Sequence, residues 1–380
     1  MRVLMTVDTV GGVWTYALEL ARALAVHDVE VTLATMGPRT TVAQRHAATA
    51  VPNVTLVESG LALEWMPHPW RDVDAAGDWL GRLAAQLVPD VVHLNGFVHA
   101  SLPFDAPTVV VAHADVCTWH RACRGVAAPP EWDEYRRRVA RGLAAADVVV
   151  APTRAILDAI LEEHQVLAPG RVIPNGRSTT APVAPKLPFV LAAGRVWDEA
   201  KGLDALAACA GEVPWPIWVA GPTLAPDGTS SVRWRDAARV HLLGEMGPEL
   251  LGSWMARASI FAAPARYEPF GLCALEAALS GCALVVSSLD TLHEVWGDAA
   301  IYVPPASPHQ LGRALRSLVE DPGRRDAMAV EAHRRALRYT PTAMATAYRA
   351  LYDELVAPAL AGAQAGGRAL LSRADPGGAS

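Results

Sequence analysis

The chain has 380 residues, of which 52% are hydrophobic, and its formal net charge at pH 7 is -6. This length predicts two domains with buried cores, and the negative charge gives no reason to expect a nucleic acid as partner. The five cysteines form no CxxC pair, and no apolar run approaches the roughly 20 residues needed to span a bilayer. We therefore expect a cytoplasmic protein with reduced thiols and no transmembrane segment.

Short apolar runs alternate with helical patterns along the whole chain. In the first half, the candidate strands are Val3–Val7, Val29–Thr35, Val54–Glu58, Val91–Leu94, Thr108–Ala112 and Val148–Ala151. In the second half, they are Phe189–Ala193, Ile217–Ala220, Val240–Leu243, Ile260–Ala263, Leu284–Ser287 and Ile301–Val303. Helical patterns between them include Trp14–Leu24, Trp132–Leu143, Leu272–Leu279 and Leu311–Leu318. Continuous apolar strands are typical of parallel sheets covered by helices on both faces, so we predict an α/β fold with two doubly wound, Rossmann-like domains.

A proline-rich segment marks the boundary between these domains. Three prolines fall within Thr179–Pro188, and proline both stiffens a linker and removes backbone donors from a sheet. We predict one domain over residues 1–178, a linker over 179–188 and a second domain over 189–340. A helix that crosses back to the first domain is predicted over 341–360, with a regular pattern to about Val356, and a flexible tail over 361–380.

The most informative segment runs from Pro264 to Ala278 and reads PARYEPFGLCALEAA. Glu268 lies in a loop after a strand, Gly271 opens a helix, and Glu276 lies about two turns inside that helix. The helix N-terminus suits a diphosphate. The two carboxylates would lie about 10 Å apart along the helix axis, more than the roughly 5–9.5 Å that separates the carboxylates of a glycosidase. This separation disfavours a hydrolase that uses these two residues. The alternative is structural, with Glu276 on a helix surface and Glu268 as the cap.

A second segment, Gly194–Gly202, follows the strand Phe189–Ala193. Arg195 and Lys201 could both reach a bound diphosphate and stabilise a departing nucleotide without a metal. The alternative is a solvated loop in which these cations pair with Asp198 or Glu199.

Weaker signals follow two strands of the first half. Gly11 and Gly12 separate a strand from a helix and allow close approach of a phosphate or sugar, although many such turns need glycine. His113 follows the strand Thr108–Ala112 and could bind a sugar hydroxyl, or be an ordinary core histidine. Asp72 and Asp74 resemble a DxD metal motif, but we interpret them as a helix start. We expect no metal ligands.

At these residues the sequence resembles the retaining glycosyltransferases of family 4, which have the two-domain GT-B fold. The resemblance extends to about Val356. Its most specific part is the E-x7-E element from Glu268 to Glu276, followed by Ser280–Ser287 and Glu294. It implies an enzyme that transfers a hexose from a UDP- or GDP-linked sugar to an acceptor hydroxyl, with no cofactor beyond this co-substrate.

The resemblance also implies roles for individual residues. Glu268 would contact sugar hydroxyls and Glu276 the ribose, while Arg195 and Lys201 would bind the diphosphate. The implied donor-binding set is Gly11, Gly12, Asn175, Arg195, Lys201, His241, Leu243, Glu268, Phe270, Gly271, Leu272 and Glu276. The implied catalytic set is His113, Arg195, Lys201 and Glu268. Arg195 and Lys201 are six residues apart where the family pattern has five, and Asp290–His293 replaces the usual glycine pair before Glu294.

The first domain is expected to bind the acceptor, a small molecule or a glycan. Candidate acceptor residues are Trp14, Asn95 and Trp119, and the two tryptophans are included because aromatic faces suit sugar rings. A basic region comprises Arg121, Arg124, Arg136, Arg137, Arg138 and Arg141. It could meet an anionic acceptor or a membrane surface, or pair with nearby acids on a solvated helix face.

Two other function classes stay open at this point. A sugar-nucleotide 2-epimerase has a similar two-domain fold and would need only the donor and water. A non-catalytic sugar-nucleotide binder would need fewer charged residues than Arg195, Lys201, Glu268 and His113 supply together. Turnover separates these classes from a transferase.

Overall fold

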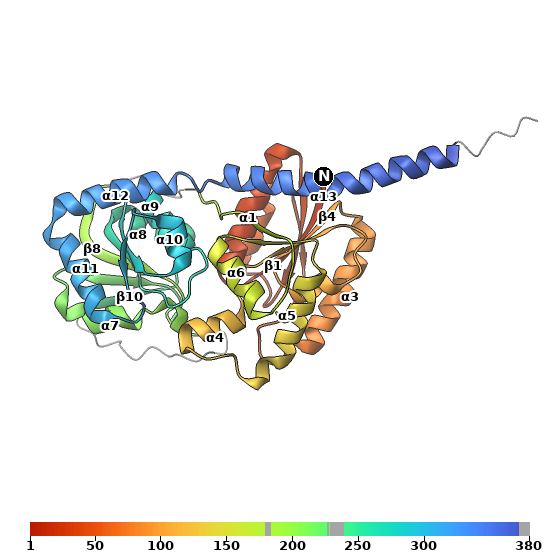
Figure 1. Cartoon of the computed structure of the whole chain (residues 1–380). Helices are drawn as coiled ribbons and strands as arrows, with labels where there is room; N and C mark the ends of the chain where they lie inside the picture. The colour runs from red at the N-terminus through yellow and green to blue at the C-terminus, as the bar shows by residue number, and fades with distance from the viewer. Residues whose placement is uncertain (179–183, 226–227, 229–238, 372–380) are drawn as a thin grey trace, which may run out of the picture. The chain divides into compact units, whose positions relative to one another are not determined.

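The computed structural model describes residues 1–178, 184–225, 228 and 239–371, with side chains as far as 357. It contains two parallel β-sheets, each packed between helices (Figure 1). The predicted α/β class with two Rossmann-like halves is confirmed.

The first sheet has seven strands in the order β3-β2-β1-β4-β5-β6-β7. Its strands are β1 (Arg2–Asp8), β2 (Glu30–Met36), β3 (Val54–Glu58), β4 (Val91–Leu94), β5 (Thr108–Val111), β6 (Val148–Ala151) and β7 (Gly170–Val172). The helices along this part of the chain are α1 (Gly12–Leu24), α2 (Val42–Thr49), α3 (Trp70–Leu87), α4 (Val116–Arg124), α5 (Asp133–Ala145) and α6 (Arg154–Glu163). The strand order reverses between β1 and β4, the kind of point at which doubly wound sheets bind ligands.

The second sheet has six strands in the order β10-β9-β8-β11-β12-β13. They are β8 (Leu187–Ala193), β9 (Ile217–Ala220), β10 (Val240–Gly244), β11 (Ala258–Ala263), β12 (Ala283–Ser287) and β13 (Ile301–Val303). The helices are α7 (Asp204–Cys209), α8 (Pro248–Arg257), α9 (Leu272–Leu279), α10 (Asp290–Trp296), α11 (Pro308–Glu320), α12 (Pro322–Ala336) and α13 (Pro341–Leu371). Here the order reverses between β8 and β11, which pair in parallel.

The packing of strand β8 explains its continuous apolar sequence. Phe189 and Leu191 belong to a core cluster with residues of α9 and α12, whereas Val190 and Ala192 belong to a cluster with residues of α7 and α11. Successive side chains of a strand point to opposite faces, so a strand covered on both faces has no polar position.

All the predicted strands are present, with bounds that differ by at most two residues, as at β8, which begins at Leu187 instead of Phe189. The prediction missed β7 (Gly170–Val172), which is only three residues long and begins with glycine. Such a short segment shows no periodicity.

The last helix is longer than its sequence pattern predicts. Helix α13 continues past Val356 to Leu371, although Gly366 and Gly367 lie in this stretch. Its alanine-rich composition favours a helix. Part of the predicted flexible tail over 361–380 is therefore helical, and the rest of it lies outside the described residues, as does 179–183 of the predicted linker.

The packing divides the chain into two compact units. One comprises Met1–Val111, Gly142–Val148 and the chain from Met344 onwards, and the other comprises Ala112–Arg141 and Val149–Ala343. In the first unit, α13 is anchored by Tyr352, whose hydroxyl lies 2.6 Å from Nδ1 of the buried His93 of β4. Among the described residues, no helix combines the length and the apolar character that a membrane span requires.

Alanine substitutions at two helical glycines would test the helix packing of this fold. A Cβ at Gly142 in α5 would lie 1.9 Å from the backbone oxygen of Phe97, whereas a Cβ at the exposed Gly81 in α3 would meet nothing within 4 Å. We expect Gly142→Ala to destabilise the protein by about 2 kcal/mol or more. Gly81→Ala should stabilise it by about 0.5–1 kcal/mol. Denaturant unfolding measures both, and similar midpoints for the two variants would contradict this account.

Candidate functional site

The central contact of the candidate site joins Lys201 to Glu268. Nζ of Lys201 lies 2.7 Å from Oε2 of Glu268, and both side chains are about four-fifths buried. Burial alone would lower the pKa of Lys201, but the Glu268 carboxylate outweighs it and holds that pKa above its ordinary value. Lys201 is therefore a fixed cation at neutral pH. The loops that carry the two residues follow β8 and β11, at the reversal point of the second sheet.

The six-residue spacing between Arg195 and Lys201 is accommodated by a short 3-10 turn, Glu199–Lys201. Asp198 caps this turn by accepting a hydrogen bond from the backbone N–H of Ala200 at 3.0 Å. Gly202 ends it at φ 59, where a Cβ would lie 2.1 Å from the backbone oxygen of Pro264. The turn therefore packs against the end of β11, which brings Lys201 to Glu268.

Glu268 also fixes the start of α9. Its Oε1 accepts a hydrogen bond from the backbone N–H of Gly271 at 3.0 Å, and its backbone oxygen accepts one from the hydroxyl of Thr291 at 2.6 Å. Gly271 has φ 90, a conformation that favours glycine. Phe270 is buried and packs edge-on against Tyr339, and Leu272 is the first residue of α9. Glu268 thus does not cap α9 through its first helical N–H groups but holds the N-cap residue Gly271, alongside its ion pair with Lys201.

Arg195 forms the ion pair with Asp198 that the sequence analysis gave as its structural alternative. Its guanidinium donates two hydrogen bonds to Oδ2 of Asp198, at 3.2 and 2.6 Å, and lies over the ring of Trp197. The side chain is 37% exposed, so part of the guanidinium faces solvent at the carboxyl end of β8. Arg195 and Lys201 follow the same strand but hold different partners.

The residues implied in nucleotide binding lie in the same unit. Glu276 in α9 pairs with Arg177 at 2.5 Å, a partner that the sequence analysis missed although it lies only two residues after Asn175. Asn175 is buried. On β10, His241 is exposed and stacks on Trp218 at a ring separation of 4.3 Å, and Leu243 is half-buried.

His113 follows β5 and is half-buried. Burial lowers the pKa of His113 to about 3, so the imidazole is neutral at physiological pH. A neutral imidazole offers one donor and one acceptor nitrogen to a sugar hydroxyl.

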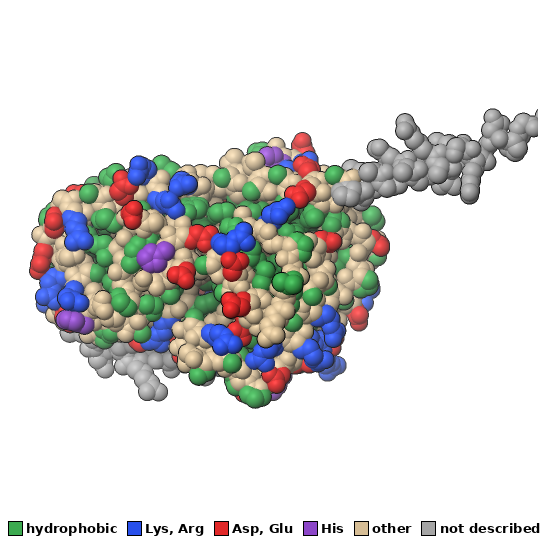
Figure 2. All heavy atoms as spheres, in the orientation of Figure 1, with side chains coloured by type: hydrophobic (Ala, Val, Ile, Leu, Met, Phe, Trp, Pro, Cys, Tyr) green, Lys and Arg blue, Asp and Glu red, His purple; other side chains and the backbone are tan. Residues whose placement is uncertain are grey.

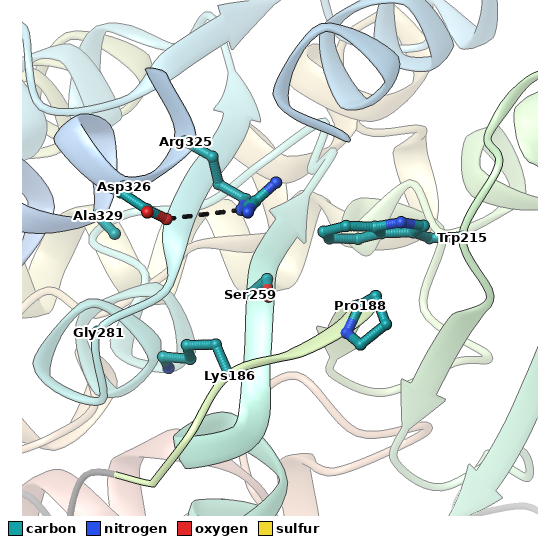
Figure 3. A pocket seen from close by; sticks show the side chains of 8 residues that line it. All are labelled: Lys186, Pro188, Trp215, Ser259, Gly281, Arg325, Asp326 and Ala329. Atoms are coloured by element: carbon teal, nitrogen blue, oxygen red, sulfur yellow. Dashed lines mark ion pairs between the residues drawn. The ribbon is translucent and has the colours of Figure 1, made fainter. Parts of the chain in front are cut away.

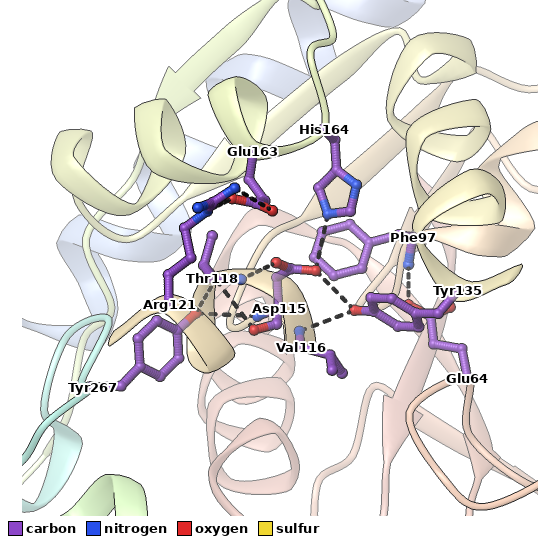
Figure 4. Close-up of polar contacts among 10 residues, drawn as sticks. All are labelled: Glu64, Phe97, Asp115, Val116, Thr118, Arg121, Tyr135, Glu163, His164 and Tyr267. Carbon is purple, nitrogen blue, oxygen red and sulfur yellow. Dashed lines mark hydrogen bonds and ion pairs between the residues drawn. The ribbon is translucent and has the colours of Figure 1, made fainter. Parts of the chain in front are cut away.

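A buried polar network that the sequence did not reveal is centred on Asp115, two residues beyond His113 (Figure 4). Its Oδ1 accepts a hydrogen bond from the Tyr135 hydroxyl and lies 3.0 Å from Nε2 of His164, and its Oδ2 caps α4 at the N–H of Thr118. Burial alone would raise the pKa of Asp115, but these hydrogen bonds outweigh it and lower that pKa below its ordinary value.

Asp115, Cys117 and His164 also bring three potential metal ligands within 4.8 Å of one another in the described part of the chain. Burial raises the pKa of Cys117 to about 12, which keeps the thiol protonated and makes it a weak ligand. The hydrogen bonds of Asp115 to His164 and to the start of α4 explain why Asp115, Cys117 and His164 lie close together.

The glycine loop and two acceptor candidates lie in the first unit. Gly11 has φ 90 and precedes α1, which begins at Gly12. Trp14 is only 7% exposed, which leaves its ring little surface to offer an acceptor. Asn95 follows β4 and donates a hydrogen bond from its amide to the backbone oxygen of Thr6 at 2.7 Å. The DxD-like Asp72 lies in the first turn of α3, so the predicted helix start is confirmed.

Most of the basic region is paired with acids. Arg124 lies over the ring of the third acceptor candidate, Trp119, and forms an ion pair with Glu199 at 2.9 Å. Further ion pairs join Arg121 to Glu163, Arg136 to Asp133, and both Arg137 and Arg138 to Glu134. Figure 2 shows positive and negative side chains interspersed on the face in view. This pairing favours the solvated helix face over an anion-binding surface.

A cavity of about 480 Å³ lies elsewhere in the second unit (Figure 3). Lys186 and Pro188 line it at the amino end of β8, and Ser259 lines it at the amino end of β11. Ligands of parallel α/β sheets bind at the carboxyl ends of the strands. The Lys201–Glu268 pair at those ends is therefore the better candidate site.

The chain matches the family model described as Glycosyltransferase Family 4 over residues 10–181 and the model described as Glycosyl transferases group 1 over residues 188–321. It is 26% identical to a D-inositol 3-phosphate glycosyltransferase of Xylanimonas cellulosilytica, in an alignment that covers 87% of this chain and 88% of the relative.

Solved structures share the fold at lower identity. Sucrose-phosphate synthase from Thermosynechococcus elongatus superposes with a TM-score of 0.79 at 19% identity, over 94% of this chain and all of that one. Anabaena Alr3699/HepE in complex with UDP-glucose superposes with a TM-score of 0.72 at 17% identity, over 95% of this chain and all of that one. These likenesses support the two-domain GT-B architecture.

The lowered pKa of His113 has a measurable consequence for the folded protein. Because the pKa is about 3 in the folded state and about 6.5 in an unfolded chain, the unfolded state binds more protons between these values. His113 should therefore lower the free energy of unfolding as the pH falls from about 6.5 towards 3. NMR of the 13C-labelled imidazoles, with His113→Gln for assignment, should show the His113 signals constant from pH 8 to 5. A midpoint near pH 6.5 would contradict the prediction.

Proposed function

Because the chain belongs to the family 4 glycosyltransferases, we propose that it transfers a hexose from a UDP- or GDP-linked sugar to an acceptor hydroxyl, with retention of anomeric configuration and without a metal or other cofactor. The single observation that carries the proposal is the Lys201–Glu268 pair beside the start of α9. It places a cation and a carboxylate together at the reversal point of a doubly wound sheet, where a sugar diphosphate needs both.

In the proposed reaction, the acceptor oxygen forms a bond to the anomeric carbon while the bond from that carbon to the diphosphate oxygen breaks. The acceptor proton passes to the departing phosphate oxygen, so atoms and charge balance without a protein nucleophile. Negative charge grows on the diphosphate during this step. Lys201, Arg195 and the N-terminus of α9 would stabilise it.

The carboxylates would orient the donor. Glu268 would accept hydrogen bonds from sugar hydroxyls, since a carboxylate has about four acceptor sites and Gly271 and Lys201 take two of them. Glu276 would bind the ribose through Oε2, since its Oε1 pairs with Arg177. The neutral His113 would bind a sugar hydroxyl instead of removing a proton.

The first test is turnover, using UDP-glucose as donor and D-inositol 3-phosphate as acceptor, compounds suggested by the Anabaena structure and the Xylanimonas relative. We expect UDP to be released only when an acceptor is present. If this pair of compounds gives no turnover, the same assay is repeated with other nucleotide sugars and other acceptors. NMR coupling constants of the first product should show an α-linkage from the α-linked donor. A β-linked product would rule out the same-face mechanism. A new epimer formed from donor alone would instead indicate an isomerase.

The two lysines of the chain form a matched pair for testing leaving-group stabilisation. Lys201→Ala should lower kcat by about a hundredfold, because the charge of the departing diphosphate loses its fixed cation. Lys186→Ala is the control, since Nζ of Lys186 donates to the backbone oxygen of Ser280 at the amino ends of the strands. This variant should keep kcat within about twofold of the wild type.

Wild-type turnover should survive EDTA, because the proposed reaction uses no metal ion. Loss of activity that only magnesium or manganese restores would refute metal independence.

A further inference from the structure

The segment that carries His113 is held on both sides. Before it, the N–H of Ala112 donates a hydrogen bond to the backbone oxygen of Val150 at 2.7 Å. After it, Asp115 is fixed by its buried network and by α4, which it caps. Only His113 and Ala114 lie between these anchors. The position of the imidazole therefore depends on both.

The anchor at Asp115 includes a side chain from the loop of Glu268. The backbone N–H of Asp115 donates to the Tyr267 hydroxyl at 3.1 Å, and that hydroxyl lies 2.9 Å from Oγ1 of Thr118 (Figure 4). The Thr118 hydroxyl donates to the backbone oxygen of Asp115 at 3.2 Å. Since each hydroxyl has one proton, Tyr267 must donate to Thr118 while it accepts from Asp115. The three groups thus form a closed ring of hydrogen bonds.

Tyr267 also contacts the turn that carries Lys201. The backbone oxygen of Ala200 accepts hydrogen bonds from the N–H of Arg266 at 2.7 Å and from that of Tyr267 at 3.3 Å. The next residue after Tyr267 is Glu268. One short loop therefore connects three parts of the candidate site, namely the Lys201 turn, the Glu268 carboxylate and the segment of His113.

We propose that Tyr267 is a positioning residue whose hydroxyl holds the His113 segment in register with the Lys201–Glu268 pair. This inference rests on the proposed function, in which His113 and Glu268 bind the same sugar. Positioning of groups that hold a reacting sugar affects the transition state more than the grip on the nucleotide. The hydroxyl of Tyr267 should therefore matter for kcat and little for the affinity of a nucleoside diphosphate.

Tyr267→Phe removes the hydroxyl and keeps the ring. It should lower kcat at least tenfold at saturating donor and acceptor, while the Kd of UDP, measured by calorimetry, changes less than twofold. Thr118→Val should give a similar loss of kcat, and the double variant should lose no more than either single variant, because both break one ring of hydrogen bonds. Thr118→Ser keeps the hydroxyl and should retain at least half of the wild-type kcat.

Tyr302→Phe is the matched control, because its hydroxyl lies 2.7 Å from the backbone oxygen of Gly297 and 3.3 Å from that of Leu292, and neither residue belongs to the ring of hydrogen bonds. It should keep kcat within twofold. A second readout does not need turnover: in NMR of 13C-labelled imidazoles, the His113 signals should shift or broaden in Tyr267→Phe and not in Tyr302→Phe. If the wild type transfers no sugar, the proposed function fails and this readout alone decides the placement of His113. Unchanged kcat or unchanged His113 signals in Tyr267→Phe would overturn the inference.

Discussion

The ion pair of Lys201 and Glu268 is the contact on which the rest of the candidate site depends. A largely buried lysine would lose part of its charge without a partner, and the carboxylate at 2.7 Å restores it. Both groups keep hydrogen-bonding capacity after this contact, because an ammonium has three donors and a carboxylate has about four acceptor sites. The pair can therefore hold its own geometry and still present a positive and a negative group to a sugar diphosphate.

The distinction between a structural and a binding role is weaker here than the sequence suggests. Glu268 accepts a hydrogen bond from the N–H of Gly271 at the start of α9 and pairs with Lys201, and both contacts fix the direction in which its remaining lone pairs point. Arg195 is held by Asp198, which also caps the turn of Lys201. A side chain that is already ordered loses less conformational entropy when a ligand binds. The contacts that would count as structural alternatives would therefore also prepare these residues for the proposed binding.

The sequence predicted the sheets because strands buried on both faces show as continuous apolar runs. The candidate residues Lys201, Glu268 and His113 were chosen by a second local rule, that ligands of such sheets bind just after the strands, and the structure places all three there. Strand β7 was missed because three residues beginning with Gly170 show no pattern. The partners Tyr267, His164 and Arg177 were also missed. Their contacts join segments far apart in sequence, and only the folded chain brings them together.

The neutral state of His113 bears on the choice between two stereochemical courses. An inverting enzyme needs a base beside the acceptor hydroxyl, and an efficient base has a pKa near the operating pH. Burial places the pKa of His113 at about 3, so its imidazole would gain little by taking the proton. Glu268 is engaged with Lys201 and the start of α9, which makes it a poor nucleophile under the anomeric carbon. Both residues are thus poor candidates for the base or nucleophile that the alternative courses require. This favours the same-face reaction proposed above, in which the attacking hydroxyl passes its proton to the departing phosphate oxygen and therefore approaches from the side of the leaving group.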